Sequence, residues 1–178
     1  PYAAQMAGRS SLRLGELAGL TQFGVNIVTL EPGAVASLRH WHLREDEFAM
    51  VLSGTLVLIE DEGEFPMVAG DCAAWKAGVP NGHRFVNRSD QPARFLIVGS
   101  KAPAETATYS DVDLTLVIQD GKARFTYHDG SDWTGPRDLG PVRRQDRDAP
   151  ARRPRAEIHR GVVADQGGTL GRVRGRQQ

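Results

Sequence analysis

The sequence is poor in features that would tie it to a membrane or to an oxidising compartment. It has one cysteine, Cys72, among 178 residues, and no apolar run approaches the roughly 18 residues of a membrane-spanning helix. A single cysteine cannot form an internal disulfide, which fits a reducing compartment and also fits some exported proteins. The first residues lack the apolar stretch of a signal peptide. We therefore expect a protein without membrane contact, located in the cytoplasm.

Residues 137–178 contain no phenylalanine, tyrosine or tryptophan. They carry 11 arginines and 5 acidic residues, a net charge of +6, whereas residues 1–136 carry 11 basic and 17 acidic residues, a net charge of −6. Because this segment has little apolar surface to offset the entropy of ordering, we predict a flexible or surface-draped tail. Its arginines could contact the phosphates of nucleic acid, but the interleaved acids and the missing aromatic side chains argue against that partner.

The middle of the sequence lacks the long apolar period of about 3.6 residues that marks a core helix. Short β-branched or apolar runs alternate there with turn residues, which is typical of a mostly antiparallel, all-β sandwich or barrel. The runs are residues 23–30, 47–53, 55–61, 72–75, 83–88 and 93–99. The predicted organisation is an N-terminal arm over residues 1–20, a barrel with a flanking hairpin over 21–135, and the tail over 136–178.

Two segments beside these runs carry weaker signals. Residues 113–119 and 122–128 flank the pair Asp120-Gly121, a strong turn signal, so a final hairpin is predicted. Residues 11–20 fit either a short helical turn or an edge strand, because their two glycines weaken a helix.

Three histidines and one glutamate in the barrel region form a candidate metal site. His40 and His42 are separated by one residue, so in a strand both imidazoles project to the same face. Glu47 opens the next run and His83 opens a later one, which allows two hairpins to bring four ligands together. The same side chains could instead be buried polar groups of a barrel that binds no metal.

These residues resemble the two sequence motifs of the cupin family. The matching positions are Gly33, His40, His42, Glu47 and Gly54 in the first motif, and Gly70, Gly78, His83 and Asn87 in the second. This sequence departs from the pattern by one extra residue before His40, by Lys76 at the usual proline, and by a longer loop before His83. The resemblance implies a double-stranded β-helix, or jelly-roll, barrel that binds one metal through three histidines and one glutamate, often as a homodimer.

One divalent transition metal is the predicted cofactor. Imidazole and carboxylate ligands without a thiolate suit Fe, Mn, Ni or Zn, and four protein ligands on a six-coordinate ion leave two positions open. The ion could act as a Lewis acid in an isomerase or lyase that takes a small organic molecule, or, as iron, could support a dioxygenase. Because no second catalytic group stands out, a non-catalytic module that binds or senses a small molecule is the alternative.

Strand alternation predicts which side chains line a cavity beside the ligands, because residues two apart share a face. Along the runs that begin at Glu47 and His83, the predicted substrate-binding residues are Ala49, Val51, Phe85 and Asn87. Such a cavity would be largely apolar and would suit an aromatic or short-chain carbonyl compound. Core packing is the alternative interpretation of the three apolar members.

For the other conspicuous residues we predict structural or surface roles and no part in a binding or catalytic site. We expect Glu45 and Asp46 in a solvated turn, Arg39 on the surface, Trp75 as a packing anchor and His128 at the rim. The sequence therefore predicts metal ligands and a cavity lining, and it predicts no catalytic acid or base.

Overall fold

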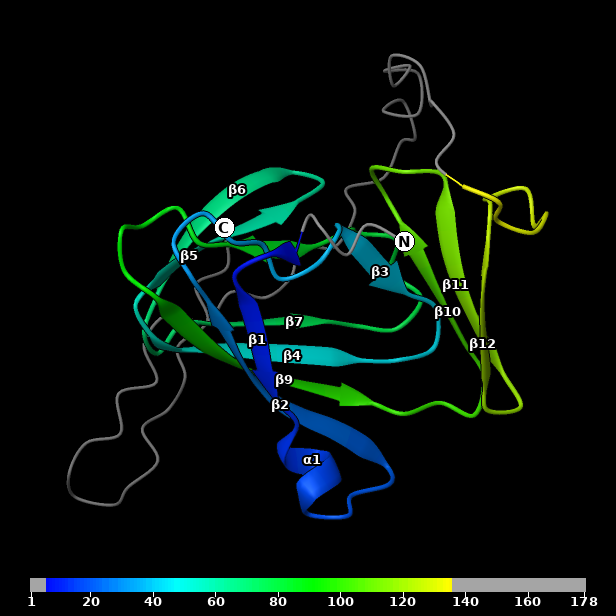
Figure 1. The fold of residues 1–178 in the computed structure, drawn as a ribbon, viewed down its shortest axis with the longest axis horizontal. Helices are drawn as coiled ribbons and strands as arrows, with labels where there is room; N and C mark the ends of the chain where they lie inside the picture. The colour runs from blue at the N-terminus through cyan, green and yellow to red at the C-terminus, as the bar shows by residue number, and fades with distance from the viewer. Residues whose placement is uncertain (1–5, 136–178) are drawn as a thin grey trace.

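The computed structural model describes residues 6–135, so the predicted tail and residues 1–5 lie outside the part discussed below. The described chain forms twelve strands and one short helix, which confirms the all-β class (Figure 1). In chain order these are β1 Arg9–Leu12, α1 Leu14–Leu17, β2 Phe23–Leu30, β3 His40–His42, β4 Glu47–Ser53, β5 Thr55–Glu60, β6 Gly63–Val68, β7 Cys72–Trp75, β8 Arg84–Val86, β9 Ala93–Ser100, β10 Glu105–Tyr109, β11 Leu114–Gln119 and β12 Lys122–Thr126.

The strands form three antiparallel sheets that enclose the barrel (Figure 1). The first sheet has the order β1-β2-β9-β4-β7, the second β12-β11-β10-β3, and the third β6-β5-β8. An isolated bridge between His40 of β3 and His83, the residue before β8, joins the second sheet to the third. The His40 amide donates to the His83 carbonyl at 3.2 Å, and the His83 amide donates to the His40 carbonyl at 2.9 Å. Two of the predicted metal ligands are thus cross-strand neighbours.

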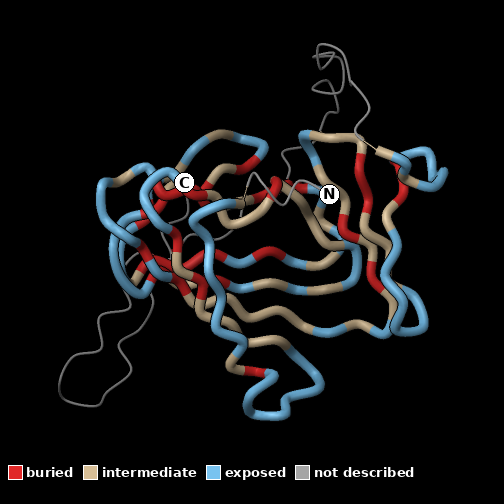
Figure 2. The backbone as a smooth tube through the Cα atoms, viewed as in Figure 1, coloured by how far each residue is buried: buried red, intermediate tan, exposed pale blue. Residues whose placement is uncertain are grey.

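The hydrophobic core takes the inward faces of the first and third sheets. Strand β4 shows the alternation that a half-buried strand requires, since Ala49 and Val51 are 0% and 1% exposed whereas Phe48 and Leu52 are exposed. Figure 2 shows buried segments along the strands and many exposed segments in the connecting turns. The other members of the core cluster are Val28, Leu30, Ala34, Leu56, Leu58, Met67, Ala73, Trp75, Phe85, Ala93 and Phe95. Burial of each large side chain contributes about 1.5–3 kcal/mol to folding.

The N-terminal segment, for which the sequence allowed either a short helical turn or an edge strand, contains one of each. Strand β1 pairs with β2 at the edge of the first sheet, with Leu12 opposite Ile27, and α1 follows directly. Part of the predicted arm therefore extends the barrel sheet. Helix α1 has four residues, and no helix within residues 6–135 has the length and hydropathy to span a bilayer.

The predicted final hairpin is confirmed as β11 and β12, with Gln119 opposite Lys122. Asp120 and Gly121 have φ values of 51° and 70°, and two successive positive values are the mark of a type I′ turn. This hairpin pairs through β10 with β3, the strand that carries His40 and His42.

Candidate metal centre

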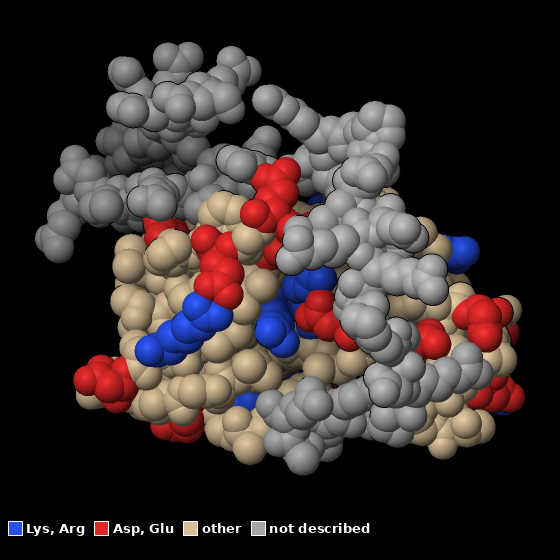
Figure 3. All heavy atoms as spheres, turned by 90° about the horizontal axis from the view of Figure 1, so that it is seen from above, with Lys and Arg blue, Asp and Glu red and all other residues tan. Residues whose placement is uncertain are grey.

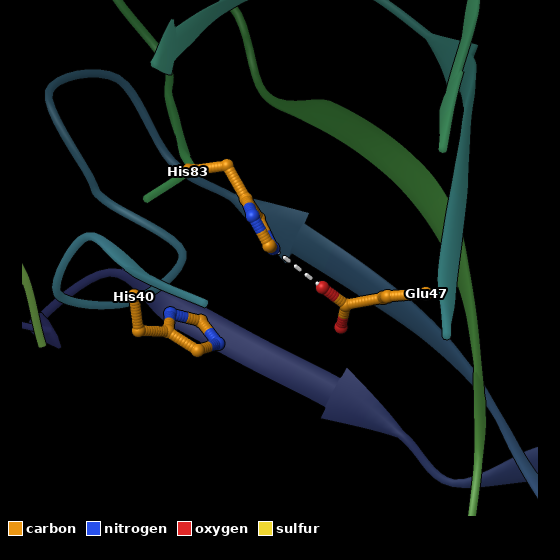
Figure 4. Close-up of side chains that lie close together, drawn as sticks. All are labelled: His40, Glu47 and His83. Atoms are coloured by element: carbon orange, nitrogen blue, oxygen red, sulfur yellow. Dashed lines mark hydrogen bonds and ion pairs between the residues drawn. The ribbon is translucent and has the colours of Figure 1, made fainter. Parts of the chain in front are cut away.

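Three of the four predicted ligands lie together inside the barrel, where three segments meet. His40 comes from β3, Glu47 is the first residue of β4, and His83 precedes β8. Each offers one ligand atom, and these atoms lie within 4.8 Å of one another. Figure 4 shows the two imidazoles and the carboxylate converging on one point between their strands. The prediction that two hairpins bring the ligands together is wrong, because β3 pairs with β10, β4 with β7 and β9, and β8 with β5, so the three side chains meet across three different sheets.

Glu47 and His83 are in direct contact. The Nε2 of His83 donates to Oε2 of Glu47 at 2.7 Å, the dashed contact in Figure 4. Burial alone would raise the pKa of Glu47, but the hydrogen bond and charge of His83, together with the charges of His40 and His42, lower it to about 2. The carboxylate is thus ionised at any physiological pH, which is the state in which it can bind a cation.

His40 is held as a neutral imidazole. Burial, followed by the nearby His83, lowers the pKa of His40 to about 4, although Glu47 acts in the opposite direction. Its Nδ1 donates to the Leu38 carbonyl at 2.8 Å, which fixes the proton on that nitrogen. The lone pair of Nε2 is then free for a metal ion.

Contacts at both ring nitrogen atoms orient His83. Its Nδ1 lies 3.3 Å from the carbonyl oxygen of Asn81, two residues earlier, and its Nε2 faces Glu47. On its flat side it stacks against Trp75, with ring centroids 3.9 Å apart and planes 12° from parallel. The indole nitrogen of Trp75 donates to the buried carboxylate of Glu60 at 2.6 Å. Trp75, interpreted from the sequence as a packing anchor, thus also fixes a predicted ligand.

His42 lies beside this group without being a member of it. Its ring centroid is 4.9 Å from that of His40 and 6.5 Å from that of His83. It belongs to a second cluster with Glu45 and Glu105, in which one ligand atom of each residue again lies within 4.8 Å of the others. His42 as a fourth ligand stays a prediction.

The donor set suits the predicted metal. Two imidazoles and an ionised carboxylate, with a third imidazole beside them and no thiolate, are ligands that divalent Fe, Mn, Ni and Zn accept. Nδ1 of His42 is buried and has no hydrogen-bond partner in the described chain, so a third imidazole with an unsatisfied nitrogen lies beside the cluster. The residues therefore fit one divalent transition metal, whose identity they do not fix.

Two further groups near the centre were not predicted as site residues. Glu45, interpreted from the sequence as part of a solvated turn, is half-buried and accepts a hydrogen bond from the Ala102 amide at 2.9 Å. Burial raises the pKa of its carboxyl group. Tyr109 lies opposite His40 in the β3–β10 pair, with ring centroids 5.7 Å apart, and burial raises the pKa of its phenol.

Arg39 is less exposed than a surface arginine. Its guanidinium forms ion pairs with Asp61 and, at 2.7 Å, with Asp111, and its side chain is 17% exposed. Figure 3 shows basic and acidic side chains side by side, with no broad patch of one sign on the visible described part of this face. These ion pairs connect the residue before β3 to the turns that follow β5 and β10.

The four predicted lining residues are all buried. Ala49, Val51 and Phe85 belong to the core cluster, and Phe85 packs against the rings of Trp75 and Phe95. The side-chain amide of Asn87 donates to the carbonyls of Leu30 and Gln91, and its oxygen accepts from the amide and hydroxyl of Ser89. These contacts favour packing and loop anchoring, and a role in substrate binding stays a prediction.

Comparison with known proteins identifies the family. A model of the cupin domain matches residues 26–99. The crystal structure of a sugar phosphate isomerase from a cupin superfamily, from Silicibacter pomeroyi, is 59% identical, with 75% of this chain and 85% of that chain covered and a TM-score of 0.73. A structure from Acidithiobacillus ferrooxidans, 23% identical over 73% of this chain and 81% of that chain, shows the same fold with a TM-score of 0.65. No curated protein matches the sequence. On the fold, the motifs and the 59% identity, the chain belongs to the cupin superfamily.

Proposed function

We propose that this cupin is a metal-dependent isomerase of a phosphorylated sugar. The observation that carries the proposal is the 59% identity, over 75% of the chain, to a structure described as a sugar phosphate isomerase. The cluster of His40, Glu47 and His83 supports a metal-dependent form of that chemistry. A fold alone supports no reaction, so the proposal rests on the identity and the site together.

The proposed centre holds one divalent ion through His40, His42, Glu47 and His83. When bound, the ion supplies Lewis acidity that polarises a carbonyl group. The protein keeps Glu47 ionised and His40 neutral, which are the states in which they can bind a cation. The backbone carbonyl groups of Leu38 and Asn81 orient the rings of His40 and His83. Trp75 covers one face of His83 and limits water there.

Interconversion of an aldose and a ketose moves one proton between neighbouring carbon atoms and a second proton between the two oxygen atoms that they carry, and it needs no external oxidant or reductant. Such a transfer needs a group that takes the proton and returns it. Glu45 and Tyr109 are the proposed groups, because each is half-buried beside a predicted ligand and each has a pKa raised by burial. The carboxylate of Glu45 suits removal of a proton from carbon, and the phenol of Tyr109 suits donation of a hydrogen bond to a substrate oxygen.

The test is conversion of defined aldose and ketose phosphates by the full chain. Metal-stripped protein is reloaded separately with Mn, Fe, Ni and Zn and incubated in deuterated water, and products are followed by proton and phosphorus NMR. Interconversion that depends on the ion, with solvent deuterium entering beside the carbonyl, is the expected result. Metal-dependent binding in calorimetry without conversion of any compound would instead support the non-catalytic binding or sensing module.

A homodimer is the proposed assembly. The outer face of the first sheet carries a row of apolar side chains across four strands, in which Leu12, Ile27, Leu96 and Met50 are successive register partners. A second row, parallel to the first, contains Val25, Val98 and Phe48. Contiguous apolar patches of this kind mark interaction surfaces. The cytoplasmic location stays a prediction from the sequence.

A further inference from the structure

Glu105 is a buried carboxylate that no pattern in the sequence singles out. Its side chain is 2% exposed, and it is the first residue of β10. Along this strand Glu105, Ala107 and Tyr109 share one face, and the pairing of β10 with β3 sets Ala107 opposite His42 and Tyr109 opposite His40. The carboxylate therefore lies on the same side of the sheet as the two imidazoles.

The carboxylate of Glu105 is fixed in position. Oε1 accepts from the Leu43 amide at 2.8 Å, and Oε2 accepts from the Arg44 amide at 2.9 Å. Nδ1 of His42 lies 3.8 Å from Oε1 of this buried carboxylate. An ionised carboxylate in such a place is costly unless a positive group lies beside it. An imidazole bound to a divalent ion would be such a group.

His42 differs from His40 and His83 in the surroundings of its Nδ1 atom. His40 and His83 direct Nδ1 to the carbonyl two residues earlier, those of Leu38 and Asn81. For His42 the corresponding carbonyl is that of His40, which instead accepts from the His83 amide in the bridge between the sheets. Nδ1 of His42 is consequently buried without a hydrogen-bond partner in the described chain.

We infer that Glu105 is a positioning residue that orients His42 by accepting a hydrogen bond from its Nδ1–H, so that Nε2 faces the metal. This inference rests on the proposed function, in which His42 is the fourth ligand. The present separation of 3.8 Å exceeds a hydrogen bond by about 1 Å, a gap that a small rotation of the ring closes. A carboxylate behind a metal-bound imidazole fixes the tautomer and raises the affinity of the ligand for the ion.

The same cluster is less suited to a second metal ion. Both oxygens of Glu105 accept backbone hydrogen bonds, and so does one oxygen of Glu45. Ligation of a second ion would use the lone pairs that remain beside these bonds, and on Oε1 it would compete with the hydrogen bond from His42 that we infer. The inference therefore predicts one ion per chain.

The test measures the dissociation constant of Co(II) by competition with a chromophoric chelator, on the full chain without an affinity tag. We expect Glu105→Gln to weaken binding about 10- to 100-fold. In the His42→Ala background, where there is no ring to orient, the same substitution should change the constant less than about twofold. Asp71→Asn is the matched control, because Asp71 is another buried carboxylate that accepts a backbone hydrogen bond, from Val68, and should leave the constant unchanged.

Each outcome bears on one of two claims. Wild-type affinity in Glu105→Gln would overturn the inference, and so would an equal loss in both backgrounds, because a loop effect through Leu43 and Arg44 does not need His42. Two ions per chain would also overturn it in favour of a second site. Failure of the wild-type chain to bind any ion would overturn the proposed function itself, and the inference with it.

Discussion

At the scale of single residues, the surroundings of His40 and Glu47 in the barrel determine their protonation states. His40 is neutral because it is buried and lies near His83, and Glu47 is ionised because three imidazoles surround it. The two groups affect each other, since the histidines lower the pKa of the Glu47 carboxyl group and the carboxylate limits the fall in the pKa of His40. A metal ion would replace the proton that now joins Glu47 to His83.

The lowered pKa of His40 makes the stability of the metal-free protein depend on pH. Between its unfolded value of 6.5 and its folded value of about 4, the unfolded chain binds the proton and the folded chain does not. Stability is therefore lost as pH falls from 6.5 to 4, by roughly 3–3.5 kcal/mol if the full shift applies. Glu47 adds a loss of the same sign between pH 4.5 and about 2.

Urea unfolding of the chelator-treated protein, measured from pH 7 to pH 4, checks this dependence. The His40→Gln variant should have a flatter profile above pH 4.5, because glutamine does not titrate. An equally steep profile in the variant would show that another group is responsible.

Tyr109 and Glu45 are expected to act in the reaction rather than in metal binding. We expect Tyr109→Phe and Glu45→Gln each to lower kcat about 100-fold or more, as for the loss of an acid or base, with metal content unchanged. Tyr127→Phe is the matched control, since the Tyr127 hydroxyl bonds to Thr134 and Gly135 at the end of the described chain. Full activity in both variants would remove these residues from the mechanism.

At the scale of elements, the sequence predicted the strands that carry alternating apolar residues and missed those that do not. The predicted runs agree with β2, β4, β5, β7, β8 and β9 to within two residues at each end. Strand β6 was missed because it contains Pro66, which is tolerated only because β6 is an edge strand of its sheet. Strand β10, with the sequence ETATY, has too few apolar residues to stand out.

The missed strand explains the missed residues of the site. Glu105 and Tyr109 approach His42 and His40 only because β10 pairs with β3, a contact between residues more than 60 positions apart. The cluster of His40, Glu47 and His83 could be predicted because the spacing of these residues follows strand geometry and matches two family motifs. The contact of Trp75 with His83 could not, because it depends on β7 pairing with β4, where Trp75 lies opposite Glu47.

Two motif glycines allow a test of how the turns hold the strands. Gly54, between β4 and β5, has a φ of 76°, and an added Cβ would lie 2.9 Å from the backbone of Pro92 and Ala93. Gly33 has a φ of 80°, with no atom within 4 Å of such a Cβ. Gly33→Ala should therefore cost only the conformational strain, about 1–2 kcal/mol.

Gly54→Ala should cost about 1–3 kcal/mol more than Gly33→Ala, because steric overlap adds to the strain. Urea denaturation of both variants gives the difference in the free energy of unfolding. Equal losses of unfolding free energy in the two variants would show that β9 moves away from the added methyl group without a cost in stability.

At the scale of the whole molecule, the two faces of the five-stranded sheet have different partners. The inner face packs the core and carries Glu47, whereas the outer face presents the two apolar rows to its surroundings. If a second copy covers the outer face, sedimentation should give a mass twice the 19.4 kDa of one chain.

Leu96→Glu, in the middle of the first row, should shift this dimer to the monomer. Leu17→Glu is the control, because Leu17 is 75% exposed on α1 and belongs to neither row. A wild-type monomer would contradict the proposed assembly, and a dimer that survives Leu96→Glu would place the interface on another face.

The central claim is one metal ion per chain on His40, His42, Glu47 and His83, and elemental analysis tests it most directly. The full chain is purified without an affinity tag, beside His42→Ala, His83→Ala and the control His128→Ala, whose ring contacts the carbonyls of Tyr109 and Leu114 at the rim. The account predicts about one divalent transition metal per chain in the wild type and in His128→Ala, and much less in the other two variants. A metal-free wild type that also fails to take up Fe, Mn, Ni or Zn, or an undiminished metal content in His83→Ala, would contradict it.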